Sequence, residues 1–124
     1  MNDLAFDASG SGEQGVVLVH GFPFTSMIWR VQREALGTQA RRVITPDLPG
    51  FGHTPGSADS VDAYAAGVCG VLDRLELERA VLGGISMGGY VALAFARLYP
   101  ERLQGLILAD TRAGAESDEG RAGR

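Results

Sequence analysis

The chain of 124 residues has a single cysteine, no apolar run of membrane-spanning length and no excess of positive charge. One cysteine, Cys69, excludes a disulfide within the chain and a metal site built from several cysteines. Acidic side chains outnumber basic ones by 15 to 11, so no basic stripe is available to neutralise nucleic-acid phosphates. The lack of a long apolar run argues against a membrane span. We therefore expect neither nucleic acid nor a membrane as a partner.

Glycine-rich phosphate loops and a targeting signal are also missing. The apolar run 16–19 leads into His20-Gly21-Phe22-Pro23, which matches neither the dinucleotide-binding nor the P-loop pattern. We predict no cofactor and no metal. The first residues lack the basic and apolar regions of a secretory signal, so the expected location is the cytoplasm.

What is present is an alternation of short apolar runs with amphipathic stretches, in a chain of single-domain length. The alternation predicts an α/β fold with a mostly parallel sheet and helices on both faces. A turn-forming cluster at 9–12 follows the first strand and predicts an N-terminal hairpin. The expected strands cover 4–8, 16–19, 42–45, 80–82 and 103–109, and the expected helices 26–36, 60–75 and 90–98.

Two of the expected helices have residue patterns that predict which side faces the core. In the second, apolar residues recur at spacings of four and three from Val61 to Leu75, and Ser60 is placed to cap the first turn. In the first, Ser26 is the expected cap, and the residues expected to face inward are Ile28, Trp29, Val31 and Ala35.

The most informative motif is Gly84-Ile85-Ser86-Met87-Gly88. It follows a short apolar strand and precedes a helix that ends at Tyr99-Pro100. Glycines two positions either side of a serine suit a sharp strand-to-helix turn that exposes the hydroxyl at a strained backbone angle. The alternative interpretation is an ordinary glycine-rich turn.

Four segments together resemble the N-terminal half of an α/β-hydrolase, in family order: 20–23, 47–52, 84–89 and 99–103. The likeness is strongest to small esterases, 3-oxoadipate enol-lactonases and cofactor-free haloperoxidase-like enzymes. It implies that residues 1–111 form the N-terminal part of a hydrolase domain. Residues 112–124 would be a solvated tail or the start of a missing lid segment.

The resemblance assigns roles by position. Ser86 would be the nucleophile, and the backbone N–H groups of Met87 and Phe22 would form the oxyanion hole. Asp110, at a strand end, is a candidate for the acid, with a turn-capping role as the alternative. In this family the base is a histidine after the serine, and no histidine follows Ser86 in the sequence. His20 would be structural and His53 a surface turn residue.

The resemblance implies a serine hydrolase of carboxylic esters or lactones that works through an acyl-enzyme. The 124-residue piece itself is expected to be inactive, because the base is missing. Two alternatives stay open: a perhydrolase or haloperoxidase-like enzyme, and a non-catalytic binding or folding module. The expected partners are a small ester or lactone and a second copy of the chain, bound through the bare apolar edge at 103–109.

Overall fold

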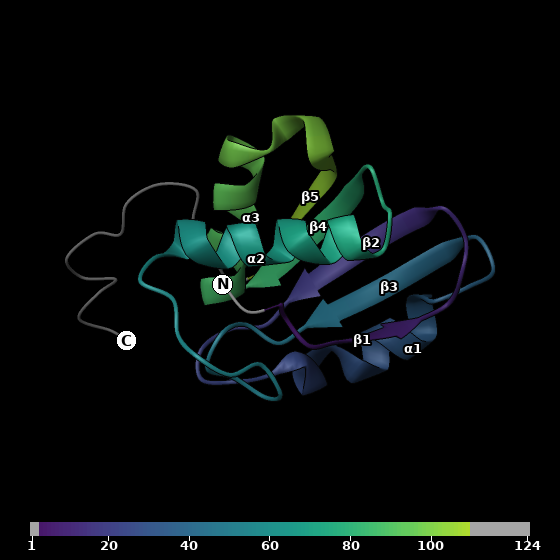
Figure 1. The fold of residues 1–124 in the computed structure, drawn as a ribbon. Helices are drawn as coiled ribbons and strands as arrows, with labels where there is room; N and C mark the ends of the chain where they lie inside the picture. Colours follow the sequence, from purple (N-terminus) through teal and green to yellow (C-terminus); the bar gives the residue numbers. More distant parts are fainter. Residues whose placement is uncertain (1–2, 110–124) are drawn as a thin grey trace.

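A computed structural model describes residues 3–109 and shows one twisted sheet with helices on both faces (Figure 1). Asp110 and the predicted tail 112–124 lie outside the described residues. The strands are β1 (Phe6–Ser9), β2 (Gln14–Val19), β3 (Arg41–Pro46), β4 (Ala80–Ile85) and β5 (Leu103–Ala109). The α-helices are α1 (Arg30–Leu36), α2 (Val61–Arg74) and α3 (Met87–Leu98), and two 3-10 turns cover Ser26–Trp29 and Pro100–Arg102.

The strand order is β1-β3-β2-β4-β5, and β2, β3, β4 and β5 run parallel. The mostly parallel sheet predicted from the sequence is therefore confirmed. From β2 the chain moves outward to β3, then returns across β2 to build β4 and β5. A right-handed crossover places its helix on one face of the sheet, and the face changes when the chain reverses its direction across the sheet. The connection from β2 to β3 therefore places α1 on the face opposite to α2 and α3, which connect β3 to β4 and β4 to β5.

The predicted N-terminal hairpin is wrong. β1 pairs antiparallel with β3, and β3 lies between β1 and β2. The connection from β1 to β2 crosses the end of β3 and lies against the loop before it, where the Ser11 N–H donates to the Thr38 carbonyl at 2.7 Å. A Cβ on Gly10 would come within 2.1 Å of the Arg41 carbonyl oxygen at the start of β3, and one on Gly12 within 2.6 Å of the backbone of the loop before β3, so this tight passage requires glycine.

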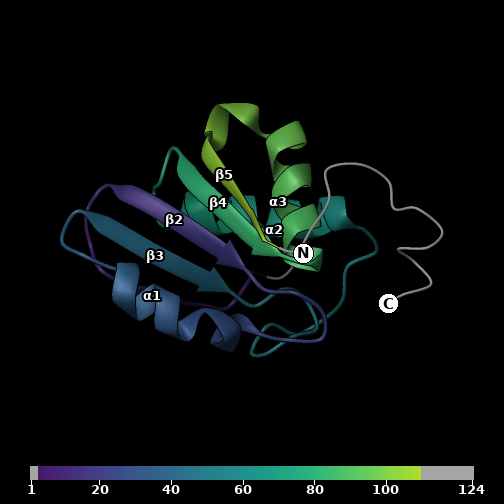
Figure 2. The same ribbon diagram turned by 180° about the vertical axis from the view of Figure 1, so that it is seen from behind.

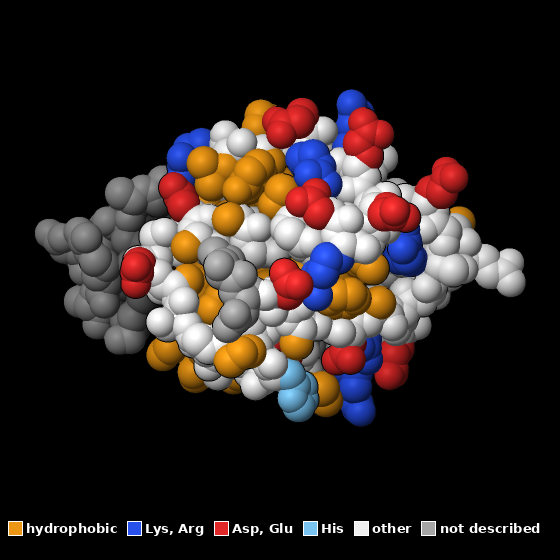
Figure 3. Space-filling model, viewed as in Figure 1, with side chains coloured by type: hydrophobic (Ala, Val, Ile, Leu, Met, Phe, Trp, Pro, Cys, Tyr) orange, Lys and Arg blue, Asp and Glu red, His pale blue; other side chains and the backbone are white. Residues whose placement is uncertain are grey.

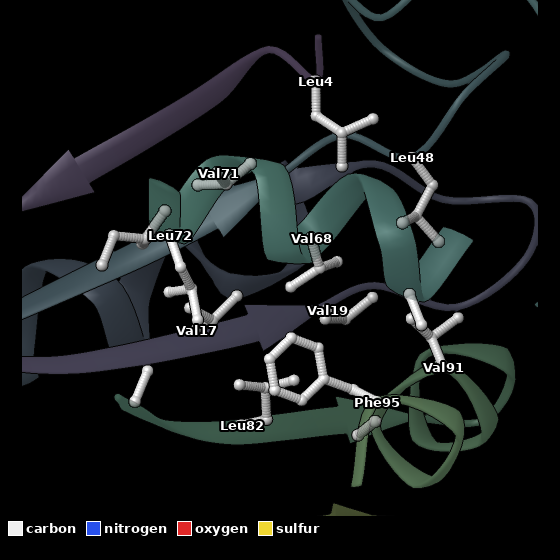
Figure 4. Close-up of a cluster of buried hydrophobic side chains, with 14 of the residues drawn as sticks. Leu4, Val17, Val19, Leu48, Val68, Val71, Leu72, Leu82, Val91 and Phe95 are labelled. Carbon is white, nitrogen blue, oxygen red and sulfur yellow. The ribbon is translucent and has the colours of Figure 1, made fainter. Parts of the chain in front are cut away.

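One face of the sheet carries the main core, between the sheet and helices α2 and α3 (Figure 4). The predicted apolar face of α2 is confirmed, and the Ser60 hydroxyl accepts the Ala63 N–H at 3.1 Å as its cap. Phe95 of α3 lies fully buried at the centre, and the labelled side chains of the sheet and the two helices converge around it. Burial of this set away from water is the main source of stability for the fold.

The other face is covered less completely. Figure 2 shows α1 lying over β3, while no described helix covers β4 and β5 on this side. Trp29 packs against Val16, Leu18 and Val43 of the sheet, as predicted. The other three predicted inward residues of this helix are wrong: Ile28, Val31 and Ala35 are exposed.

The reason for this error lies in how the first helix starts. Its N-terminal turn is a 3-10 helix capped by Thr25, whose hydroxyl accepts the Met27 N–H, and Ser26 is not the cap. The tighter turn rotates the side chains away from the positions that an α-helix beginning at Ser26 would give.

β5 forms one edge of the sheet, as the sequence predicted. Leu106 and Leu108 are each 37% exposed and Ile107 is 52% exposed.

On the face seen in Figure 3, basic and acidic side chains are interspersed and no basic stripe is visible. Among residues 3–109, no helix has the length and apolar character needed to cross a bilayer.

Candidate active site

The strand order places a switch point between β2 and β4, where the chain leaves two neighbouring parallel strands in opposite directions. Ligands of open α/β sheets bind at the carboxyl ends of the strands at such a point. Segment 20–24 follows β2, and Ser86 directly follows β4. Two motifs that are more than sixty residues apart in the sequence therefore meet at one edge of the sheet.

Ser86 lies between β4 and α3 with φ 54° and ψ −117°, a region that non-glycine residues rarely occupy. Its N–H donates to the Ala109 carbonyl of β5 at 3.1 Å, and its carbonyl accepts the Gly89 N–H at 3.0 Å. The strained turn that the sequence predicted is therefore present. Such strain persists only where the surroundings hold it, and it is common at functional sites.

Steric contacts require glycine at positions 84 and 88, on either side of Ser86. A Cβ on Gly84 would lie 2.1 Å from the Gly88 carbonyl oxygen. A Cβ on Gly88 would lie 2.2 Å from the Val19 carbonyl oxygen and 2.6 Å from that of His20. These contacts are with backbone atoms, so the start of α3 presses directly on the end of β2.

The loop after β2 lies against the serine. A Cβ on Gly21 would meet the Ser86 Cβ at 3.2 Å and the Ile85 carbonyl oxygen at 3.1 Å. Phe22 is the next residue in this loop, and its side chain is 66% exposed. On the other side, Met87 is the first residue of α3, where helix N–H groups have no acceptor within the helix and the dipole favours negative charge. Phe22 thus follows the residue that lies against Ser86, and Met87 follows Ser86 itself.

His20 is fully buried, and both of its ring nitrogens contact backbone groups. Nε2 lies 3.0 Å from the Leu48 N–H nitrogen, and Nδ1 lies 3.0 Å from the Gly21 carbonyl oxygen. Burial lowers the imidazole pKa below its ordinary value, against the opposing effects of the Gly21 hydrogen bond and the Asp47 charge. The ring is held between two loops, in agreement with the structural role expected of His20.

Asp47 organises the loop that contacts His20. Its Oδ1 accepts the Ser26 N–H at 2.8 Å and its Oδ2 accepts the His53 N–H at 3.1 Å. Its carbonyl oxygen accepts the Thr54 hydroxyl at 2.6 Å. Gly52 adopts φ 52°, and a Cβ there would lie 2.3 Å from the Asp47 carboxylate. These contacts hold the loop at 47–54 in one conformation.

Aromatic side chains surround the same loops. Phe51 makes edge contacts with the rings of His20 and Phe22, with centroids 5.2 and 5.8 Å apart. Phe24 is exposed beside them. Trp29, in contrast, packs on the α1 face of the sheet and belongs to the core. The loop after β2, whose Gly21 lies against Ser86, therefore carries exposed aromatic side chains.

Two further features lie away from this edge. A cavity of about 500 Å³ is lined by residues that include Glu13, Arg42 and Glu76, at the amino ends of the strands. Cys69 is half-buried on α2, and desolvation raises the pKa of its thiol. That shift favours the protonated thiol, which is the unreactive form.

The comparisons with known proteins define the class. The family described as alpha/beta hydrolase fold matches residues 15–122. The chain belongs to this family.

Among curated relatives, the chain is 42% identical over 98 residues to a 2-hydroxy-6-oxo-2,4-heptadienoate hydrolase of Pseudomonas putida, a match that covers 75% of this chain and 36% of the relative. Among solved structures, a thermophilic esterase from Thermogutta terrifontis is 47% identical with a TM-score of 0.84, covering 97% of this chain and 44% of the esterase. Est816, described as an N-acyl homoserine lactone degrading enzyme, is 31% identical with a TM-score of 0.78, covering 85% of this chain and 40% of its own. The chain spans less than half the length of each.

Proposed function

We propose that this chain carries the nucleophile half of a serine hydrolase that acts on carboxylic esters or lactones. The observation that carries the proposal is the strained backbone of Ser86 at the switch point, with the loop after β2 against its Cβ. The likeness to an esterase and to a lactone-degrading enzyme supports the substrate class.

The chemistry proposed for this geometry is acyl transfer. The Ser86 Oγ attacks the carbonyl carbon and forms a C–O bond, while the carbonyl electron pair moves to oxygen. The N–H groups of Met87 and Phe22 stabilise this oxyanion, and each such donor is worth about 3 kcal/mol in comparable enzymes. Collapse of the intermediate expels the alcohol and leaves an acyl group on Ser86. Water then releases the acid.

Each of these steps needs a base, and the described residues do not supply one from the expected position. His20 has both nitrogens in contact with backbone, and His53 lies on an exposed loop before Ser86. We therefore propose that residues 1–124 do not turn over an ester unaided. In a p-nitrophenyl ester assay, the chain and Ser86→Ala should both give the background rate. Turnover that Ser86→Ala abolishes would contradict the missing base.

The role of Ser86 has its own test. External imidazole can replace the base, so the chain treated with p-nitrophenyl acetate and imidazole should acquire an acetyl group on Ser86. Mass spectrometry of the peptides locates the group, and Ser60, the cap of α2, serves as the internal control. Acetylation of Ser60 and Ser86 to the same extent would refute a nucleophile role for Ser86.

A second candidate is hydrolysis of a 2-hydroxy-6-oxo dienoic acid. It is favoured by the 42% identity to the Pseudomonas putida relative that carries this name. The same Ser86 and oxyanion donors would act on a ketone carbonyl, and the bond broken would be carbon–carbon.

A further inference from the structure

We propose that His20 is a positioning residue whose Nδ1-protonated, neutral ring sets the direction of the Phe22 N–H in the loop that lies against Ser86. The inference rests on the proposed role of that N–H as an oxyanion donor. The tautomer and the orientation of the peptide group are properties of the chain itself and can be measured without any catalytic assay.

The tautomer follows from the partner of Nε2. The Leu48 N–H is a donor only, and it lies 3.0 Å from Nε2, so this nitrogen must present its lone pair. In a neutral imidazole the proton then resides on Nδ1. Nδ1 faces the Gly21 carbonyl oxygen at 3.0 Å, an acceptor that matches an N–H. The two contacts require the same tautomer.

The Gly21 carbonyl transmits this constraint to Phe22. It accepts the Phe24 N–H at 2.9 Å in addition to the His20 ring, so its direction is set by two donors. The carbonyl of Gly21 and the N–H of Phe22 belong to one planar trans peptide group and point in opposite directions. A carbonyl that points to His20 therefore turns the Phe22 N–H away from the ring.

The loop at 47–54, which contains the Leu48 N–H that His20 accepts, is itself held by hydrogen bonds. The Leu48 N–H lies one residue after Asp47, whose carboxylate and carbonyl oxygens accept three hydrogen bonds. The Phe51 ring also packs against the imidazole in a T-shaped contact, with centroids 5.2 Å apart. The ring thus couples the loop at 47–54 to the loop after β2.

Protonation would break this coupling. A second proton would place an N–H on Nε2 opposite the Leu48 N–H, and two donors cannot bond to each other. Asp47 is the charged group that the described residues place against the ring, and its carboxylate favours the protonated form. Burial opposes protonation and is the larger effect. We expect the coupling to hold at neutral pH and to fail in acid.

The first experiment uses the unmodified chain. Long-range ¹H–¹⁵N NMR at pH 7 should show His20 with an unprotonated Nε2 and a protonated Nδ1. A protonated Nε2 on His20 would overturn the proposal.

Two variants then separate the two contacts. His20→Asn places an amide N–H near Nδ1 but loses the acceptor for Leu48, so the Leu48 amide should exchange with solvent about tenfold faster. His20→Gln places an oxygen near Nε2 but loses the donor to Gly21, so the residual dipolar coupling of the Phe22 N–H should change. His53→Gln is the control and should alter neither.

An unchanged Phe22 coupling in folded His20→Gln would refute the positioning role. If neither variant folds, the tautomer of the unmodified chain decides the outcome. The tautomer of His20 and the dipolar coupling of Phe22 do not depend on whether Ser86 can be acetylated. Failure of the proposed function and failure of this inference are therefore distinguishable.

Discussion

Gly88→Ala and Gly70→Ala make the same chemical change within two helices, and the structure predicts opposite effects. Both replacements remove the intrinsic helix penalty of glycine, which is about 1 kcal/mol relative to alanine. Gly70 lies within α2, and a Cβ there meets nothing within 4 Å. Gly70→Ala should therefore stabilise the chain by up to about 1 kcal/mol.

At Gly88 the steric cost exceeds the gain in propensity. The added Cβ would lie 2.2 Å from the Val19 oxygen and 2.6 Å from the His20 oxygen. Both atoms are backbone, so α3 must move by about 1 Å relative to β2, and overpacking of this kind costs about 3 kcal/mol at the upper end of the usual range. The net effect should be a loss of about 2 kcal/mol in the free energy of unfolding.

Urea and thermal unfolding followed by circular dichroism measure both effects. At about 4 °C per kcal/mol for a chain of this size, the Tm should fall by about 8 °C for Gly88→Ala and rise by about 4 °C for Gly70→Ala. A Gly88→Ala chain at least as stable as the unmodified one would refute the argument that backbone contact with β2 dictates glycine at this position.

Two further predictions concern the sheet edge and pH. The exposed β5 edge should cause self-association at micromolar concentration; Ile107→Lys should reduce it, because a charge on an edge strand opposes pairing, and Val31→Lys, equally apolar but on α1, should not. A single monomer boundary for the unmodified chain in sedimentation velocity would contradict this. Because burial lowers the pKa of His20 in the folded state, the unfolded state binds more protons below about pH 6.5. Stability should therefore fall as the pH drops below that value, with a slope of at most about 1.4 kcal/mol per pH unit from this group. A slope that His20→Gln leaves unchanged would contradict this assignment.

The local elements of the fold followed from short-range patterns. The four-and-three spacing and Ser60 located α2, and the glycines around Ser86 located the strained turn. The capping residue of the first helix was misplaced by one, and three of its four predicted inward side chains are exposed. Residue patterns within one element carry such information because turns, caps and steric limits act over a few residues.

The tertiary structure alone decided which segments meet. The sequence did not indicate that β1 pairs with β3, nor that the amide of Leu48 contacts His20. Strand pairing and loop contacts between distant residues depend on how the whole sheet buries its faces, and no local spacing encodes them. The sequence by itself determined that a serine is mounted on a strained turn. Only the packed sheet brought the Gly21 loop against that serine, because β2 and β4 become neighbours when the chain reverses its winding.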